Sequence, residues 1–213
     1  AFYGNRLEVV PLQHQTLPVE TCPSGNGIEQ MLRSQRLSFV AARKPRTSVS
    51  AKTNQVEAEM IAATVVEIYN INKEDIDETQ TIGVIVPYRN QIVTIRNAID
   101  RYGIATLHNI TIDTVERYQG SQRDYIIYGF TVQQPYQLNF LTNNVFEEDG
   151  MAIDRKLNVA MTRARLHLIL VGNPDILREN LTFYKLLEYA KSKSAYINVP
   201  MEHYCEGKFS LAR

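Results

Sequence analysis

Short, continuously apolar runs separated by helical segments are the feature that most restricts the fold of this chain. A run without polar alternation is typical of a strand covered on both faces, and such strands occur in parallel sheets. Four runs of this kind are TIGVIVPY at 81–88, NITIDTV at 109–115, DYIIYGFT at 124–131 and RLHLILVGN at 165–173. Their alternation with helices predicts an α/β protein with a mostly parallel, doubly wound sheet.

The helices between these runs have their own signals. Asn54 followed by Glu57 is typical of a helix N-terminus, and an apolar stripe that includes Met60 and Val65 predicts a helix over 55–69. RKLNVAMTRA at 155–164 also has helical periodicity and leads directly into an apolar strand. Ligands of doubly wound sheets bind at strand ends, so polar residues near these ends are candidate site residues.

The remaining parts of the chain suggest its boundaries. Prolines and glycines predict that residues 1–35 form a loop-rich lead-in, and the chain is expected to be part of a longer protein. The predicted domain covers 36–195, starting at the strand RLSFVA, and 196–213 is expected to be a tail without regular pattern. The polar segment after 131, up to about 150, is expected to be a long surface insertion.

Composition excludes several protein classes. No apolar run approaches the roughly 20 residues that a membrane helix needs. Cys22 and Cys205 lie far apart, with no CxxC and no histidine at metal-ligand spacing, which favours a reducing, cytoplasmic setting and no metal site.

Charge gives one local signal. Lys plus Arg and Asp plus Glu both number 23, so the whole chain has no net attraction for polyanions. The stretch from Arg33 to Lys52 contains basic but no acidic residues. A solvated loop and a polyanion contact both fit this stretch.

The chain contains no GxxxxGK[ST] loop, which would hold phosphates, and no Asp-Glu pair after an apolar strand. It is therefore not expected to hydrolyse a nucleotide by itself.

Three segments resemble, in order, the C-terminal motifs of superfamily 1 helicases. The segments are GVIVPYRNQ, TVERYQGSQRD and RKLNVAMTRAR, and FYGNRL at 2–7 resembles the start of the same domain. The similar branch translocates 5′ to 3′ and includes nonsense-mediated-decay helicases and DNA helicase/nucleases. The resemblance, over roughly residues 1–175, implies the second RecA-like motor domain, a P-loop NTPase-like fold without its own P-loop.

The resemblance also implies a nucleotide site. In this family ATP and Mg²⁺ are bound mainly by an upstream RecA-like domain, here outside the chain, while the second domain supplies an arginine finger to the γ-phosphate. The matching residue is Arg163, with Arg165 as a supporting residue. Gly120 and Gln122 match nucleotide-contacting positions. Gln122 replaces the usual glutamate, and can accept a hydrogen bond from a ribose hydroxyl without adding charge.

A second set of residues is implied to contact single-stranded nucleic acid: Pro87, Tyr88, Arg89, Thr114 and Gln119. An aromatic ring can stack on bases and a guanidinium can bind phosphate. Core packing of Tyr88 and a plain strand role for Thr114 remain alternatives.

The resulting hypothesis is the second motor domain of an ATP-dependent helicase acting on nucleic acid, with DNA favoured because the family contains many DNA helicases. The alternative is a non-catalytic nucleic-acid-binding or docking module with a helicase-like fold.

Overall fold

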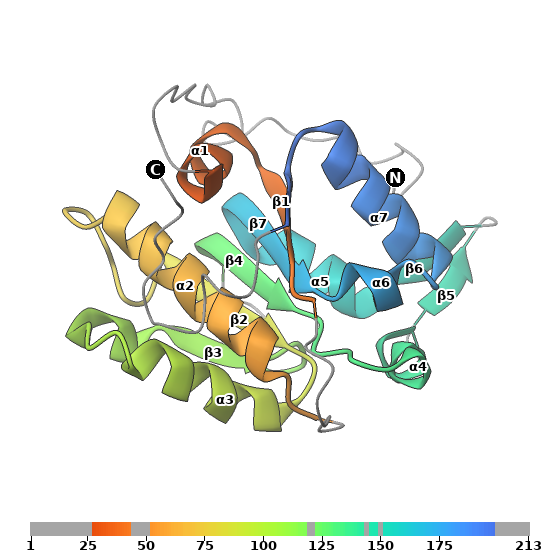
Figure 1. Cartoon of the computed structure of the whole chain (residues 1–213), viewed down its shortest axis with the longest axis horizontal. Coiled ribbons are helices and arrows are strands. Elements are labelled where there is room, and N and C mark those ends of the chain that lie inside the picture. The colour runs from red at the N-terminus through yellow and green to blue at the C-terminus, as the bar shows by residue number, and fades with distance from the viewer. Residues whose placement is uncertain (1–26, 44–51, 119–121, 143–144, 149–150, 199–213) are drawn as a thin grey trace.

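The computed structural model describes residues 27–43, 52–118, 122–142, 145–148 and 151–198. Its centre is a six-stranded sheet in the order β3-β2-β4-β7-β1-β8, with every neighbouring pair parallel (Figure 1). The strands are β1 (Leu37–Ala41), β2 (Ile82–Val86), β3 (Thr111–Thr114), β4 (Arg123–Gly129), β7 (Ala164–Gly172) and β8 (Tyr196–Asn198). This arrangement confirms the predicted α/β class and parallel sheet.

Helices cover both faces of the sheet (Figure 1). One core lies under α1 (Gly27–Ser34), α2 (Gln55–Ile71) and α3 (Arg89–Asp100). The other lies under α5 (Arg155–Arg163), α6 (Pro174–Leu177) and α7 (Leu181–Ser192). All five residues of β2 are buried, as its unbroken apolar run indicates.

Local signals in the sequence mark several helix ends correctly. The Asn54 side chain accepts a hydrogen bond from the Glu57 N–H at the start of α2, and Asn173 caps α6 in the same way through Asp175. Gly103 has φ of +65° just beyond α3, a conformation that glycine adopts without steric cost.

Several elements carry no clear sequence pattern. A one-turn 3₁₀ helix, η2 (Ala105–Asn109), precedes β3, and β8 extends the sheet beyond residue 195 by pairing with β1. The segment expected to be a surface insertion contains η3 (Pro135–Gln137), α4 (Leu138–Thr142) and the hairpin β5 (Val145–Glu148) and β6 (Met151–Asp154). Leu138 and Leu141 are buried in the core, so the expectation of a purely surface segment is wrong. Elements this short show too few turns for a helical period to be recognised.

The connection between β3 and β4 crosses the sheet. Both strands are parallel to β2, which lies between them, so residues 115–122 must return from the carboxyl edge to the amino edge. Such crossovers usually need a dozen or more residues and a helix. Here Tyr118 lies directly on β2 at Gly83, where an added Cβ would be 1.7 Å from the tyrosine oxygen. Gly83 therefore makes room for the crossover.

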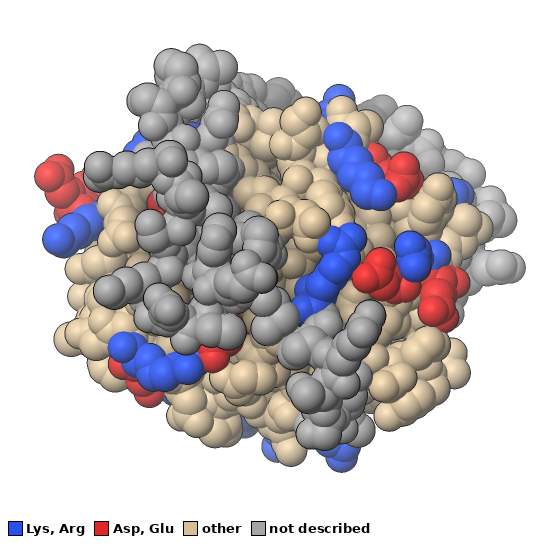
Figure 2. All heavy atoms as spheres, in the orientation of Figure 1, with Lys and Arg blue, Asp and Glu red and all other residues tan. Residues whose placement is uncertain are grey.

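The charged side chains do not form one continuous field. In Figure 2 the Lys and Arg atoms on the viewed face lie in separate groups, several of them beside Asp or Glu atoms. The ion pairs of the described residues include Arg101 with Glu59 and Arg43 with Asp175. No helix in the described ranges is long and apolar enough to cross a bilayer.

Candidate functional site

Four of the residues predicted to contact nucleic acid meet at one open hollow of about 600 Å³ at the carboxyl edge of the sheet. β2 ends immediately before Pro87 and Tyr88, and β3 ends at Thr114. The hollow is lined by Lys52, Pro87, Tyr88, Arg89, Asn90, Thr114, Glu116, Arg117 and Phe140. Strand ends that are neighbours in the sheet therefore bring together residues that lie far apart in the sequence.

Tyr88 lines the hollow and also packs against a second aromatic ring. It has an extended backbone, with φ of −125° and ψ of 130°, just before α3, and Arg89 begins that helix. Its ring stacks on Phe140 with centroids 4.7 Å apart and planes inclined by 20°. Burial, with a smaller contribution from Tyr136, raises the pKa of the Tyr88 hydroxyl above its usual value. Tyr88 is thus a partly packed aromatic that still faces the hollow.

Buried side-chain amides hold the walls of the hollow together. The Gln91 side chain, fully buried on α3, accepts from the Asn54 N–H at 2.8 Å and donates to the Asn54 carbonyl at 2.9 Å. Gln133 donates to the carbonyl of Thr53. Thr53 and Asn54, which follow Lys52, are thereby tied to the chain after β4 and to α3.

A buried carboxyl group fixes the chain where it leaves β4. Thr131 has φ of 59°, which is uncommon for a β-branched residue. Its N–H lies 2.8 and 2.9 Å from the two carboxyl oxygens of Glu57, and its hydroxyl donates to Oε1 at 3.2 Å. Burial raises the pKa of Glu57 to about 8, against the opposing effect of these hydrogen bonds. The sequence pattern identified Glu57 only as a helix-start acid.

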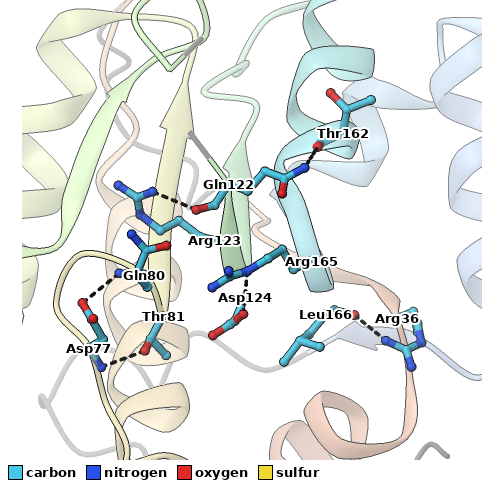
Figure 3. A network of polar contacts seen from close by, with 10 residues as sticks. All are labelled: Arg36, Asp77, Gln80, Thr81, Gln122, Arg123, Asp124, Thr162, Arg165 and Leu166. Atoms are coloured by element: carbon cyan, nitrogen blue, oxygen red, sulfur yellow. Dashed lines mark hydrogen bonds and ion pairs between the residues drawn. The ribbon is translucent and has the colours of Figure 1, made fainter. Parts of the chain in front are cut away.

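Of the predicted nucleotide residues, Gln122, Arg163 and Arg165 lie at the opposite, amino edge of the sheet, where Figure 3 shows Gln122 and Arg165. Gln122 immediately precedes β4, and its Nε2 lies 3.5 Å from the Thr162 carbonyl near the end of α5. Arg163 ends that helix, and β7 begins with Ala164, which pairs with Arg123 of β4. The structure therefore divides the candidate residues into two sets on opposite edges.

The two arginines of TRAR have different surroundings. Arg165 donates through Nε to Asp124 at 2.9 Å, and both side chains are about one-third exposed. Arg163 is half-buried, and its Nε is buried without a hydrogen-bond partner among the described residues. Arg165 is thus held in an ion pair. The buried donor of Arg163 has the chemistry to bind a phosphate oxygen.

Two predicted site residues, Gln119 for nucleic acid and Gly120 for the nucleotide, lie outside the described residues. Next to them, sequence reasoning missed the role of Arg123. This side chain is buried, donates to the Gln122 carbonyl at 2.8 Å and to the Thr111 hydroxyl at 3.1 Å, and lies over the Tyr118 ring. The position of Gln122 is thus anchored through its own backbone.

The fit to ATP and Mg²⁺ can be tested on the residues present. Gln122 and Arg163 offer an amide and a guanidinium, which are suited to a ribose hydroxyl and to phosphate oxygens. Within the described ranges, no group of three His, Cys, Asp or Glu side chains could hold a metal ion. These two residues fit contacts to a nucleotide, and neither would be a metal ligand.

Comparisons with known proteins identify the family of this chain. Residues 1–175 match the family described as "AAA domain". The chain is 34% identical over 158 residues to helicase sen1 of Schizosaccharomyces pombe, covering 73% of this chain and 9% of that protein. It is 31% identical over 144 residues to the putative helicase MOV-10 of Gallus gallus, covering 62% and 14%.

A third relative is the regulator of nonsense transcripts 1 homolog of Neurospora crassa, with 28% identity over 152 residues, covering 70% of this chain and 13% of the relative. The chain therefore spans only about a tenth of the length of these relatives. Its fold, its ordered motifs and the family match together show that the chain belongs to the AAA domain family, as a C-terminal RecA-like motor domain of the superfamily 1 helicases related to nonsense-mediated-decay enzymes.

Proposed function

We propose that this chain is the second motor domain of an ATP-dependent helicase, in which Arg163 completes the nucleotide site of an upstream RecA-like domain. The observation that carries the proposal is the contrast between the two neighbouring arginines. Arg165 is paired with Asp124, whereas Arg163 keeps a buried donor without a partner in the described part of the chain. A buried donor without a partner in the described residues can be satisfied by a ligand or by another domain.

The chemistry assigned to Arg163 is electrostatic. During hydrolysis water attacks the γ-phosphorus and the bond to ADP breaks, while negative charge spreads over the phosphoryl oxygens. The planar guanidinium stays protonated and can donate two hydrogen bonds to these oxygens. Gln122 is proposed to contact the nucleotide from the same edge, and Arg165 to support it. ATP and Mg²⁺ are bound mainly by the upstream domain in this proposal.

The proposal is tested by Arg163→Ala in the full-length protein. Nucleic-acid-stimulated ATP hydrolysis is expected to fall by roughly 10³-fold or more, while nucleotide binding is kept. Arg178→Ala is a matched control, because Arg178 is exposed and lies at the end of α6. The isolated chain is expected to show negligible hydrolysis. Hydrolysis at the normal rate in Arg163→Ala would refute the finger assignment.

The hollow at the carboxyl edge is proposed to hold part of a single strand, through Arg89, Tyr88 and Thr114. We propose DNA as the strand. The name of one relative refers to transcripts, so binding should be compared on DNA and RNA strands of equal sequence. A clear preference for RNA would replace DNA in this proposal.

The same hollow also supports the second candidate, a non-catalytic nucleic-acid-binding module, because it contains Lys52 from the basic stretch. In that case the chain would bind single strands with the same affinity whether or not the upstream domain is attached, and Arg163→Ala would leave the activity of the full-length protein unchanged.

A further inference from the structure

The segment after β4 adds two aromatic side chains to the carboxyl edge. Tyr136 in η3 is 64% exposed and Phe140 in α4 is 38% exposed, whereas Leu138 and Leu141 of the same segment are buried. The leucines anchor the segment in the core and leave the aromatic rings at the surface. Neither aromatic residue belongs to the three motifs that identify the family.

One of these rings reaches the hollow and the other lies near it, both from a separate part of the chain. Phe140 lines the hollow and stacks on Tyr88. Tyr136 is close enough to contribute to the raised pKa of Tyr88. Three aromatic residues from two distant segments are therefore gathered at one place.

Hydrogen bonds fix the turn that precedes α4 and Phe140. The Gln137 side chain accepts from the N–H groups of Gln133 and Gln134 at 2.7 and 2.8 Å, which closes the turn before α4. Upstream of that turn, Gln133 is bonded to Thr53 and Thr131 to Glu57. A side chain that is already ordered loses little conformational entropy when a ligand binds.

The charges around the rings indicate the kind of ligand. Lys52, Arg89 and Arg117 line the same hollow, together with one carboxylate, Glu116. Cations beside exposed aromatic faces match a ligand that alternates phosphates with flat rings, which is the chemistry of single-stranded nucleic acid. An acidic peptide would satisfy the cations but would offer no flat rings for stacking.

We infer that Phe140, with Tyr136 beside it, forms a nucleobase-stacking platform outside the helicase motifs, while the cations of the hollow bind the flanking phosphates. The inference rests on the proposed function, since it presumes that the hollow holds a single strand. It assigns a binding role to the segment between β4 and β5 and predicts that bases, in addition to phosphates, contribute to affinity.

The test compares a fluorescent single strand of thymidines with a strand of the same length that carries abasic sites. Phe140→Ala is expected to weaken binding of the thymidine strand to the whole chain by roughly 10-fold. Binding of the abasic strand should not change, and Phe140→Tyr, which keeps the ring, should bind both strands as the wild type does. Tyr184→Ala is a matched control, because Tyr184 is an exposed aromatic on α7.

Arg89→Ala is expected to weaken the binding of both strands to the same extent, because it removes a phosphate contact. If Phe140→Ala binds the thymidine strand as tightly as the wild type, or loses affinity equally for both strands, the platform is refuted and the proposed function stands. If the wild-type chain binds neither strand, the single-strand role of the hollow is refuted as well. The thermal unfolding midpoints of the variants show whether a loss of binding reflects a loss of folding.

Discussion

At the scale of single residues, the hydrogen-bond partners of a buried polar group indicate whether its role is structural or functional. His167 is buried between the sheet and α1. Histidine is often a catalytic residue, but the contacts of this one indicate a structural role. Its Nδ1 donates to the Leu32 carbonyl at 3.2 Å, and its Nε2 accepts from the Ser38 hydroxyl at 2.6 Å. A carbonyl can only accept, so this contact fixes the neutral tautomer. The ring therefore serves to satisfy buried polar atoms.

This environment predicts a pH dependence of stability. Burial lowers the pKa of His167 from 6.5 to about 4, aided by the nearby charge of Arg36. The folded state thus favours the neutral ring, so its contribution is complete above pH 6.5 and is lost as pH falls toward 4. We expect the free energy of unfolding to drop by on the order of 3 kcal/mol over this range from His167 alone.

Urea unfolding of the wild type and of His167→Asn, followed from pH 7 to pH 4, measures this contribution as the difference between the two curves. His108→Asn is the control, because His108 is exposed and pairs with Asp100 at the surface. Parallel curves for the wild type and His167→Asn would contradict the prediction.

At the scale of elements, the crossover between β3 and β4 predicts an unusual pair of mutational effects. Gly83→Ala is expected to cost roughly 2 kcal/mol of stability, because the added Cβ would overlap the buried Tyr118 ring. Tyr118→Phe alone should be neutral or slightly stabilising, since the Tyr118 hydroxyl is buried without a partner among the described residues. Combining the two should recover part of the loss. Chemical denaturation of all three variants checks this, and a strictly additive double variant would argue against the contact.

The elements also show which features can be predicted from sequence. The apolar runs predicted the central strands of the sheet, because a strand buried on both faces, such as β2, consists almost entirely of apolar residues. α4 and β8 were not predicted, because they are three to five residues long and owe their structure to packing and strand pairing. Phe140 was missed for the same reason: its importance arises from its contact with Tyr88, 52 positions earlier in the sequence.

The candidate site was predicted unevenly. Pro87, Tyr88, Arg89 and Thr114 were expected at strand ends and do share one hollow. Arg163 is separated from that hollow because it precedes β7, whereas Tyr88 follows β2, and the two ends of parallel strands lie at opposite edges of the sheet. Which residues are neighbours along one edge depends on the strand order, which the sequence does not show. The Glu57–Thr131 contact joins residues 74 positions apart and follows no local pattern.

At the scale of the whole molecule, the balanced charge limits how a strand can be attracted. With 23 basic and 23 acidic residues, long-range steering is absent and the cations of the hollow must act locally. Lys52, Arg89 and Arg117 could release counterions on binding. We expect the logarithm of the binding constant for a single strand to fall with the logarithm of salt concentration with a slope of about −2.

Fluorescence anisotropy titrations at several salt concentrations measure this slope for the wild type, for Arg89→Ala and for Arg178→Ala as an exposed control away from the hollow. Arg89→Ala should lower the slope by less than one unit, to about −1.4. A wild-type slope near zero would show that phosphates are not bound at the hollow.

The crossover has one more consequence for the molecule as a whole. The Tyr118 ring lies against β2 at Gly83, and Gln122 follows it only four positions later in the sequence. Four residues at full extension reach at most about 14 Å, so Gln122 must lie within that distance of Tyr118. Tyr118 is also only four positions after Thr114, which lines the hollow. Burial of this one tyrosine therefore keeps Thr114 and Gln122 each within about 14 Å of the same point in the chain.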